Sequence, residues 1–169
     1  MTGKCELVLA QAKDLHRCID ILRAGRDFQR AQGFVQWPDG FPNEAVIRSD
    51  IRKKLGYVVK VDDVIAAYLY LGFDGDPSYP QIKGAWQYDD PYAVIHRIAI
   101  ADEFRGMGLA DITFRLVGDF CKEKGVSLLR IDTHERNTRM QHVLDKNGFV
   151  YCGIVIQDNG ERLAYEKKL

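Results

Sequence analysis

The spacing of apolar residues divides the chain into short elements of two kinds. Apolar positions recur every three or four residues, the spacing of one helix face, in four segments: 15–30, 44–55, 109–124 and 137–146. Short apolar runs and two-residue alternation predict strands at residues 6–10, 57–60, 64–72, 92–100, 127–132, 149–156 and 162–167. Turns are expected at residues 61–63 and 157–160.

The order of these elements mixes strands and helices along the whole chain. It predicts an α+β fold with a central mixed β-sheet of about seven strands flanked by about four helices. The length of 169 residues fits a single domain over residues 1–169. Two connections, 33–43 and 73–91, are rich in aromatic residues, proline and glycine, and loops as long as the second are usually functional or mobile.

The segment 93–116 combines three features of an anion site. A β-branched strand leads into the turn RGMGLA at residues 105–110, and an amphipathic helix follows directly. The first backbone N–H groups of a helix lack partners within it, and the helix dipole adds partial positive charge there. We therefore expect an anion, and a phosphate chain in particular, to bind this turn.

Charge and composition narrow the classes of partner. Lys plus Arg and Asp plus Glu each number 24, so no basic excess favours binding to nucleic acid or to a membrane surface. No apolar run approaches the roughly 20 residues that span a bilayer. The polar N-terminus does not resemble a signal peptide, so we expect a cytoplasmic protein. Four cysteines without CxxC spacing are expected to be reduced, and no metal ion is expected.

The strand, turn and helix together resemble the GNAT superfamily of N-acetyltransferases. Its signature is Q/R-x-x-G-x-G/A, which residues 105–110 match at every fixed position. Downstream, Asn137 precedes Gly148 and Phe149 by the family's usual spacing of eleven residues. A dinucleotide-binding fold is disfavoured. Its glycine fingerprint follows the first strand of a βαβ unit, whereas the turn at 105–110 follows the fourth predicted strand.

The resemblance implies acetyl-CoA as co-substrate and no metal ion. Backbone amides of the signature would hold the pyrophosphate, at Arg105, Gly106, Met107, Gly108, Leu109 and Ala110. Main-chain groups of Ile98, Ala99 and Ile100 would bind the pantetheine arm, and the N–H near Ile98 would polarise the thioester carbonyl. Asn137 would hydrogen-bond the arm or the leaving sulfur, and Lys146 would reach the adenosine phosphate.

The implied acceptor is a primary amine of a small molecule or peptide, which attacks directly in a ternary complex. Many relatives carry a tyrosine seven residues after the asparagine, as general acid to the departing thiolate. Here that position is Leu144. A water molecule supplies the proton instead, or the thiolate leaves unprotonated, which a thiol pKa of about 8.5 permits.

Candidates for the base and for the acceptor pocket come from the residues themselves. His134 and His96 are candidate bases because imidazole titrates near neutrality, and Asp132 and Glu135 are expected to raise the pKa of His134. Deprotonation through water is the alternative. The acceptor pocket is expected to use aromatic side chains of the two long connections, namely Trp37, Phe41, Trp86, Tyr88 and Tyr92. The alternative is that Trp37 and Trp86 pin these loops to the core. Asp89 and Asp90 would attract a cationic amine or form a solvated turn.

Three other functions stay open at this stage. The enzyme could transfer acetyl to oxygen or use another acyl donor. Leu144 leaves room for a coenzyme A-binding sensor without turnover. A nucleotide-phosphate binding module would require the signature to be coincidental. A homodimer is compatible with the sequence, since strand-exchanged dimers are common among proteins that it resembles.

Overall fold

The computed structural model describes residues 3–157 and 160–169. Its contacts divide the chain into two compact units. The first unit comprises Met1–Leu71 and His96–Val117, and the second comprises Gly72–Ile95 and Gly118–Leu169. The chain crosses between the units at residues 71–72, 95–96 and 117–118.

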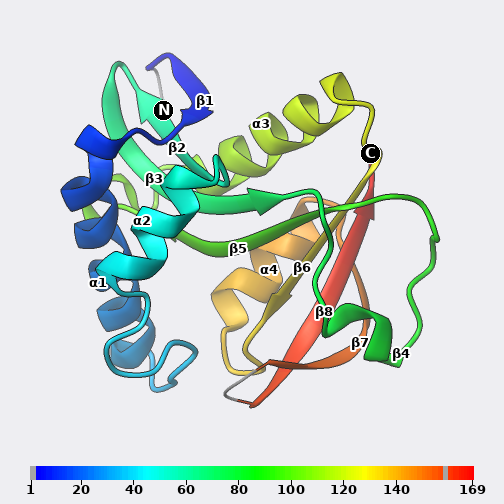
Figure 1. Ribbon diagram of the computed structural model, residues 1–169. Helices are drawn as coiled ribbons and strands as arrows, with labels where there is room; N and C mark the ends of the chain where they lie inside the picture. The colour runs from blue at the N-terminus through cyan, green and yellow to red at the C-terminus, as the bar shows by residue number, and fades with distance from the viewer. Residues whose placement is uncertain (1–2, 158–159) are drawn as a thin grey trace. The chain divides into compact units, whose positions relative to one another are not determined.

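The first unit is built from the N-terminal elements and the middle of the chain. Its elements are β1 (Cys5–Leu9), α1 (Leu15–Ala31), α2 (Glu44–Arg52), β2 (Gly56–Val61), β3 (Val64–Gly72), the second part of β5 (Ala93–Ile100) and the start of α3 (Leu109–Glu123). The strand order is β1-β2-β3-β5, and β2 runs antiparallel to both of its neighbours. In Figure 1, α1 and α2 lie side by side, in agreement with the contacts between them.

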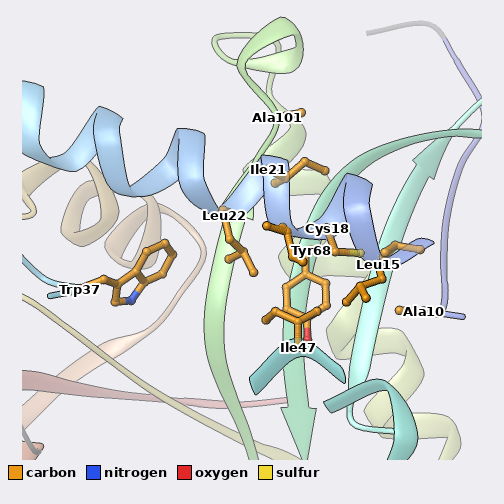
Figure 2. Close-up of a cluster of buried hydrophobic side chains, with 12 residues drawn as sticks. Ala10, Leu15, Cys18, Ile21, Leu22, Trp37, Ile47, Tyr68 and Ala101 are labelled. Atoms are coloured by element: carbon orange, nitrogen blue, oxygen red, sulfur yellow. The ribbon is translucent and has the colours of Figure 1, made fainter. Parts of the chain in front are cut away.

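The apolar face of α1 forms the core of the first unit. Leu15, Cys18 and Leu22 recur at helical spacing, and all three are buried. They pack with Ile47 of α2 and with Tyr68 of β3, whose ring lies among them in Figure 2. Burial of this stripe explains why the periodicity predicted the helix correctly.

The second unit carries the remaining strands. Its elements are the first part of β5, β4 (Lys83–Gly84), the end of α3, β6 (Leu128–Thr133), α4 (Thr138–Lys146), β7 (Val150–Gln157) and β8 (Gly160–Lys168). The strand order is β5-β6-β8-β7-β4. The β5–β6 pair is parallel, whereas β6–β8, β8–β7 and β7–β4 are antiparallel. Part of the turn expected at 157–160 lies outside the described residues.

The fold class predicted from the sequence is confirmed. The described residues form four helices and a mixed sheet of eight strands, one more than the seven marked by periodicity. The additional strand is β4, within the connection 73–91, where Lys83 and Gly84 pair with β7. A strand of two residues has no period to detect. None of the helices in the described ranges is both long and apolar enough to cross a membrane.

The end of one helix differs from the expected one. The helix expected to reach residue 55 ends at Arg52, because Lys54 takes a positive φ of 60°. At the start of α1, Asp14 occupies the N-cap position, where its carboxylate accepts the N–H of Gln11 at 2.8 Å and makes no side-chain cap bond. The hairpin turn expected at 61–63 is confirmed, with Asp62 and Asp63 both at positive φ.

Candidate functional site

The glycine-rich turn at 105–110 belongs to the first unit and leads into α3. Gly106 and Gly108 have φ of 76° and 79°, a left-handed conformation that glycine adopts without steric cost. Both glycines are exposed, and a Cβ placed on either would meet no protein atom within 4 Å. The space beside the turn is therefore open to a ligand.

The backbone at the start of α3 presents N–H groups to that space. The first hydrogen bond within the helix joins the Ile112 N–H to the Gly108 carbonyl at 3.3 Å. The N–H groups of Leu109 and Ala110 precede this bond, and such groups have no acceptor inside their own helix. With the partial positive charge of the helix N-terminus, they fit an anionic group such as a pyrophosphate.

The side chain of Arg105 turns back onto the protein. Its guanidinium lies 3.9 Å from the centre of the Phe28 ring, donates to the Ile100 carbonyl at 3.3 Å, and pairs with Asp102. These contacts brace the turn against α1 and the end of β5. Met107, between the two glycines, is half exposed.

Strand β5 is irregular just before the residues expected to bind the donor. Its parallel pairing with β6 covers Ala93 to Ile95, and Arg97 then takes a φ of 48°, which is uncommon for a residue with a side chain. Ala99 points towards α1, where its Cβ lies 3.0 Å from the position a Cβ on Gly25 would take. Because side chains alternate along a strand, Ile98 and Ile100 point to the opposite face.

Arg97 is held by a buried carboxylate that sequence reasoning missed. Its Nε and Nη2 donate to the two oxygens of Asp50, on α2, at 2.9 and 2.8 Å. The Tyr68 hydroxyl donates to the same carboxylate at 2.7 Å, and burial followed by the Asp50 charge raises the pKa of Tyr68. The available signal was an arginine within an apolar strand, which requires a partner.

His96, the first of the two candidate bases, lies on β5 in the first unit. Its ring is half buried and tilted against the ring of Tyr70, with 5.4 Å between the ring centres. The Arg97 guanidinium covers the same tyrosine ring at 4.7 Å. His96 is thus packed among side chains of its own unit.

His134, the second candidate base, follows β6 in the second unit. Its Nδ1 accepts the backbone N–H of Arg136 at 3.0 Å. A neutral imidazole has a single acceptor nitrogen, so this bond uses the lone pair that a base would need. The expectation of a raised pKa is wrong: burial and then Arg162 lower the pKa of His134, outweighing the opposite effect of Glu135.

Asp132 does not act on His134 as expected, because its carboxylate is engaged elsewhere in the second unit. Its Oδ2 accepts the Tyr79 hydroxyl at 2.8 Å and the Gln157 side-chain amide at 3.0 Å. The same amide donates to Ser78 at 3.1 Å. This network fixes the connection 73–91 to β6 and β7.

Three further positions on α4 have distinct environments. Asn137 is buried, and its Oδ1 caps the helix by accepting the Met140 N–H at 3.1 Å. Lys146 is exposed. Leu144 is fully buried in the core.

The aromatic residues of the long connection already hold a cation from the protein itself. The Arg130 guanidinium lies 4.1 Å from the ring centres of both Trp86 and Tyr92. Its Nε donates to the buried Glu166 at 3.2 Å, and its Nη2 donates to the Tyr88 carbonyl at 2.6 Å. Trp86 and Tyr92 are therefore engaged in the second unit's own structure.

The remaining acceptor candidates also have partners within their own units. Trp37 is buried in the core cluster of the first unit, as Figure 2 shows, and Phe41 packs against that cluster. Tyr88 is partly exposed, with the Lys168 ammonium 5.3 Å from its ring centre. The same lysine pairs with Asp90 at 2.6 Å.

The signature turn has a counterpart in a known family. A sequence model described as the acetyltransferase (GNAT) family matches residues 21–149, which include the turn, β5 and α4. This chain belongs to the GNAT acetyltransferase family.

Solved structures of other GNAT proteins share the fold. An acetyltransferase of the GNAT family from Streptococcus agalactiae 2603 is 34% identical, with a TM-score of 0.91 over 98% of this chain and 95% of that one. A GNAT-family acetyltransferase from Listeria monocytogenes 4b F2365 is 20% identical, with a TM-score of 0.76 over 100% and 99% of the two chains.

A third similar structure was solved with two small molecules bound. The aminoglycoside acetyltransferase AAC(6')-Ib, in complex with ribostamycin and coenzyme A, is 18% identical, with a TM-score of 0.72 over 98% of this chain and 93% of that one. At this identity the likeness concerns the fold. No curated protein matches the chain.

Proposed function

We propose that the protein is an acetyl-CoA-dependent N-acetyltransferase that acts on a primary amine of a small molecule or peptide. The observation that carries this proposal is the turn at 105–110. It combines two left-handed glycines, open space beside them and the N-terminus of α3, within a GNAT acetyltransferase. A phosphate chain is the ligand that this combination favours.

The chain's own residues divide the binding of the donor. The amides of residues 106–110 bind the pyrophosphate, whereas the Arg105 N–H expected to join them already donates to the Asp102 carbonyl at 3.2 Å. The main chain of Ile98, Ala99 and Ile100 binds the pantetheine arm. The N–H near Ile98 stabilises the oxyanion that forms when the amine attacks the thioester carbonyl. We assign Asn137 to a hydrogen bond with the arm and the exposed Lys146 to the adenosine phosphate.

A protonated amine must lose a proton before it attacks. His134 is poorly suited to take it, because its Nδ1 lone pair accepts the Arg136 N–H. His96 is half buried against Tyr70. We therefore assign deprotonation to water, with the amine attacking directly in a ternary complex.

The leaving group needs no acid from position 144. The Leu144 side chain has no proton to donate, and it is fully buried in the core. A thiol with a pKa of about 8.5 can leave as the thiolate near neutral pH, or water can protonate it. Because position 144 supplies no acid, the alternative function is a sensor that binds coenzyme A without turnover.

Two assays test the proposal. Thermal shift with acetyl-CoA, ATP and NAD tests the ligand: we expect stabilisation by acetyl-CoA, and stabilisation by ATP or NAD alone would reject the proposal. Release of free thiol across a panel of amino acids, polyamines, aminoglycosides and peptide amines tests turnover. Saturable acetyl-CoA binding without thiol release from any of these amines would favour the sensor. Release with alcohols alone would favour O-acetylation.

A further inference from the structure

The strand residue directly before the proposed donor-binding segment is held in an unusual conformation by a residue from another element. Arg97 has a φ of 48°, which residues other than glycine rarely adopt. Such a conformation persists only where surrounding contacts determine it, and it clusters at functional segments. Here the surrounding contacts come from Asp50 on α2.

The geometry of this contact is well suited to fix a backbone. The Nε and Nη2 of Arg97 donate to Oδ2 and Oδ1 of Asp50, at 2.9 and 2.8 Å. These two bonds fix the side chain in orientation as well as in position. Asp50 is buried, with 5% of its surface exposed, and its Oδ2 also accepts the Tyr68 hydroxyl at 2.7 Å. Tyr70 supports the other side of the guanidinium.

Stability alone is a poor reason for a buried ion pair. Removing two charges from water offsets most of their attraction, and apolar side chains of similar volume often stabilise a core as well. A buried pair can instead select one conformation. The conformation at stake is the left-handed one at Arg97, which sets the direction of the peptide groups of Ile98, Ala99 and Ile100 that follow.

We infer that Asp50 is a positioning residue for the acetyl donor: through its paired contacts with Arg97, it fixes the main chain of residues 98–100 in the orientation that binds the pantetheine arm and the thioester carbonyl. This inference rests on the proposed function. Asp50 touches neither substrate, and it acts through Arg97.

The first test compares the two partners of the same carboxylate. Asp50→Asn keeps the size of the side chain and an acceptor for Tyr68, but loses the charged two-point contact with Arg97. We expect the KM for acetyl-CoA to rise about ten-fold, with a matching loss of coenzyme A affinity by calorimetry. Tyr68→Phe, the control, removes the other hydrogen bond to Asp50 and should leave the KM for acetyl-CoA within about two-fold. Equal increases in both variants would overturn the inference.

The second test is a rescue. Glycine adopts a positive φ without support, so Asp50 should become dispensable once residue 97 is glycine. In the double variant Asp50→Asn with Arg97→Gly, we expect the KM for acetyl-CoA to return to within about three-fold of wild type. A double variant as impaired as Asp50→Asn would show that the carboxylate acts by another route and would overturn the inference.

A further variant covers the case in which Asp50→Asn does not fold, and binding by the wild-type protein separates this inference from the proposed function. If Asp50→Asn fails to fold, Arg97→Lys replaces it, because lysine keeps the charge but lacks the planar fork, and the same rise in KM is expected. An unchanged KM in that variant would overturn the inference. A wild-type protein that binds no acetyl-CoA would overturn the proposed function and this inference together. Normal wild-type binding with a failed rescue would overturn the inference alone.

Discussion

Two segments that both looked like ligand sites from the sequence differ in what surrounds them. The turn at 105–110, in the first unit, has glycines whose missing side chains would point into open space. The aromatic segment 86–92, in the second unit, has rings that enclose the guanidinium of Arg130. The comparison teaches that the right residue types predict a site only where the protein has not already supplied the partner.

The backbone explains why the space beside the turn is open to a ligand. Its ligand groups are N–H groups at a helix start, which the helix cannot satisfy internally. The ligand groups of the aromatic segment are ring faces, which any nearby cation can satisfy. Arg130 is such a cation, and its ion pair with the buried Glu166 holds it beside the rings.

The largest expected effect tests the structural role of the aromatic segment. Arg130→Met leaves the carboxylate of Glu166, with 1% of its surface exposed, without its charged partner. We expect the free energy of unfolding in urea to fall by about 3–5 kcal/mol. The control Lys168→Met removes an exposed ion pair of the same unit and should cost about 1 kcal/mol or less. An Arg130→Met protein that stays stable and loses only acceptor binding would make the rings a substrate site after all.

The next effect tests the open space beside the turn. Gly108→Glu places a side chain and a negative charge where the pyrophosphate is proposed to bind, and it strains a residue with φ of 79°. We expect acetyl-CoA affinity to fall by about a hundred-fold or more, measured by calorimetry.

A matched glycine separates strain from blocked binding. Gly125, after α3, has φ of 77° and also no protein atom within 4 Å of a Cβ. Gly125→Glu therefore carries the same strain and charge, yet should bind acetyl-CoA with wild-type affinity. Equal affinities for acetyl-CoA in the Gly108 and Gly125 variants would count against the turn as the binding site.

The smallest effect concerns His134. Burial and Arg162 lower its pKa in the folded protein, so the unfolded chain takes up the proton first as the pH falls. The stability contributed by the neutral ring is thus present above about pH 6.5, the usual histidine value, and is lost as the pH falls through the lower folded value.

Melting temperatures between about pH 5 and pH 8 test this sign. His134→Gln should lose less stability than wild type on acidification, whereas His142→Gln, at an exposed position of α4, should follow wild type. The acetylation rate of His134→Gln should keep its pH dependence. Loss of that dependence would restore His134 as the base.

The fold was largely readable from local patterns. The helix at α1 shows its buried stripe in the sequence, and Asp62 and Asp63 mark a tight turn between two strands. Strand β4 was not readable, because Lys83 and Gly84 form a strand only through pairing with β7. The end of α2 was missed because Lys54, rather than a glycine, takes the left-handed conformation.

The site was readable where its chemistry is local and unreadable where it depends on distant partners. The signature turn carries its own backbone geometry. The engagement of Trp86 depends on Arg130, and the conformation of Arg97 depends on Asp50, in each case a residue more than forty positions away in the sequence. The lowered pKa of His134 likewise comes from burial in the fold and then from Arg162 on another strand.

Amide chemical shifts of the ¹⁵N-labelled protein during a titration with acetyl-CoA test the central claim most directly. We predict saturable shifts at Gly106, Gly108, Leu109 and Ala110, with Gly125 unchanged as the matched open glycine. Saturable binding of acetyl-CoA that leaves these four amides unmoved would contradict the account.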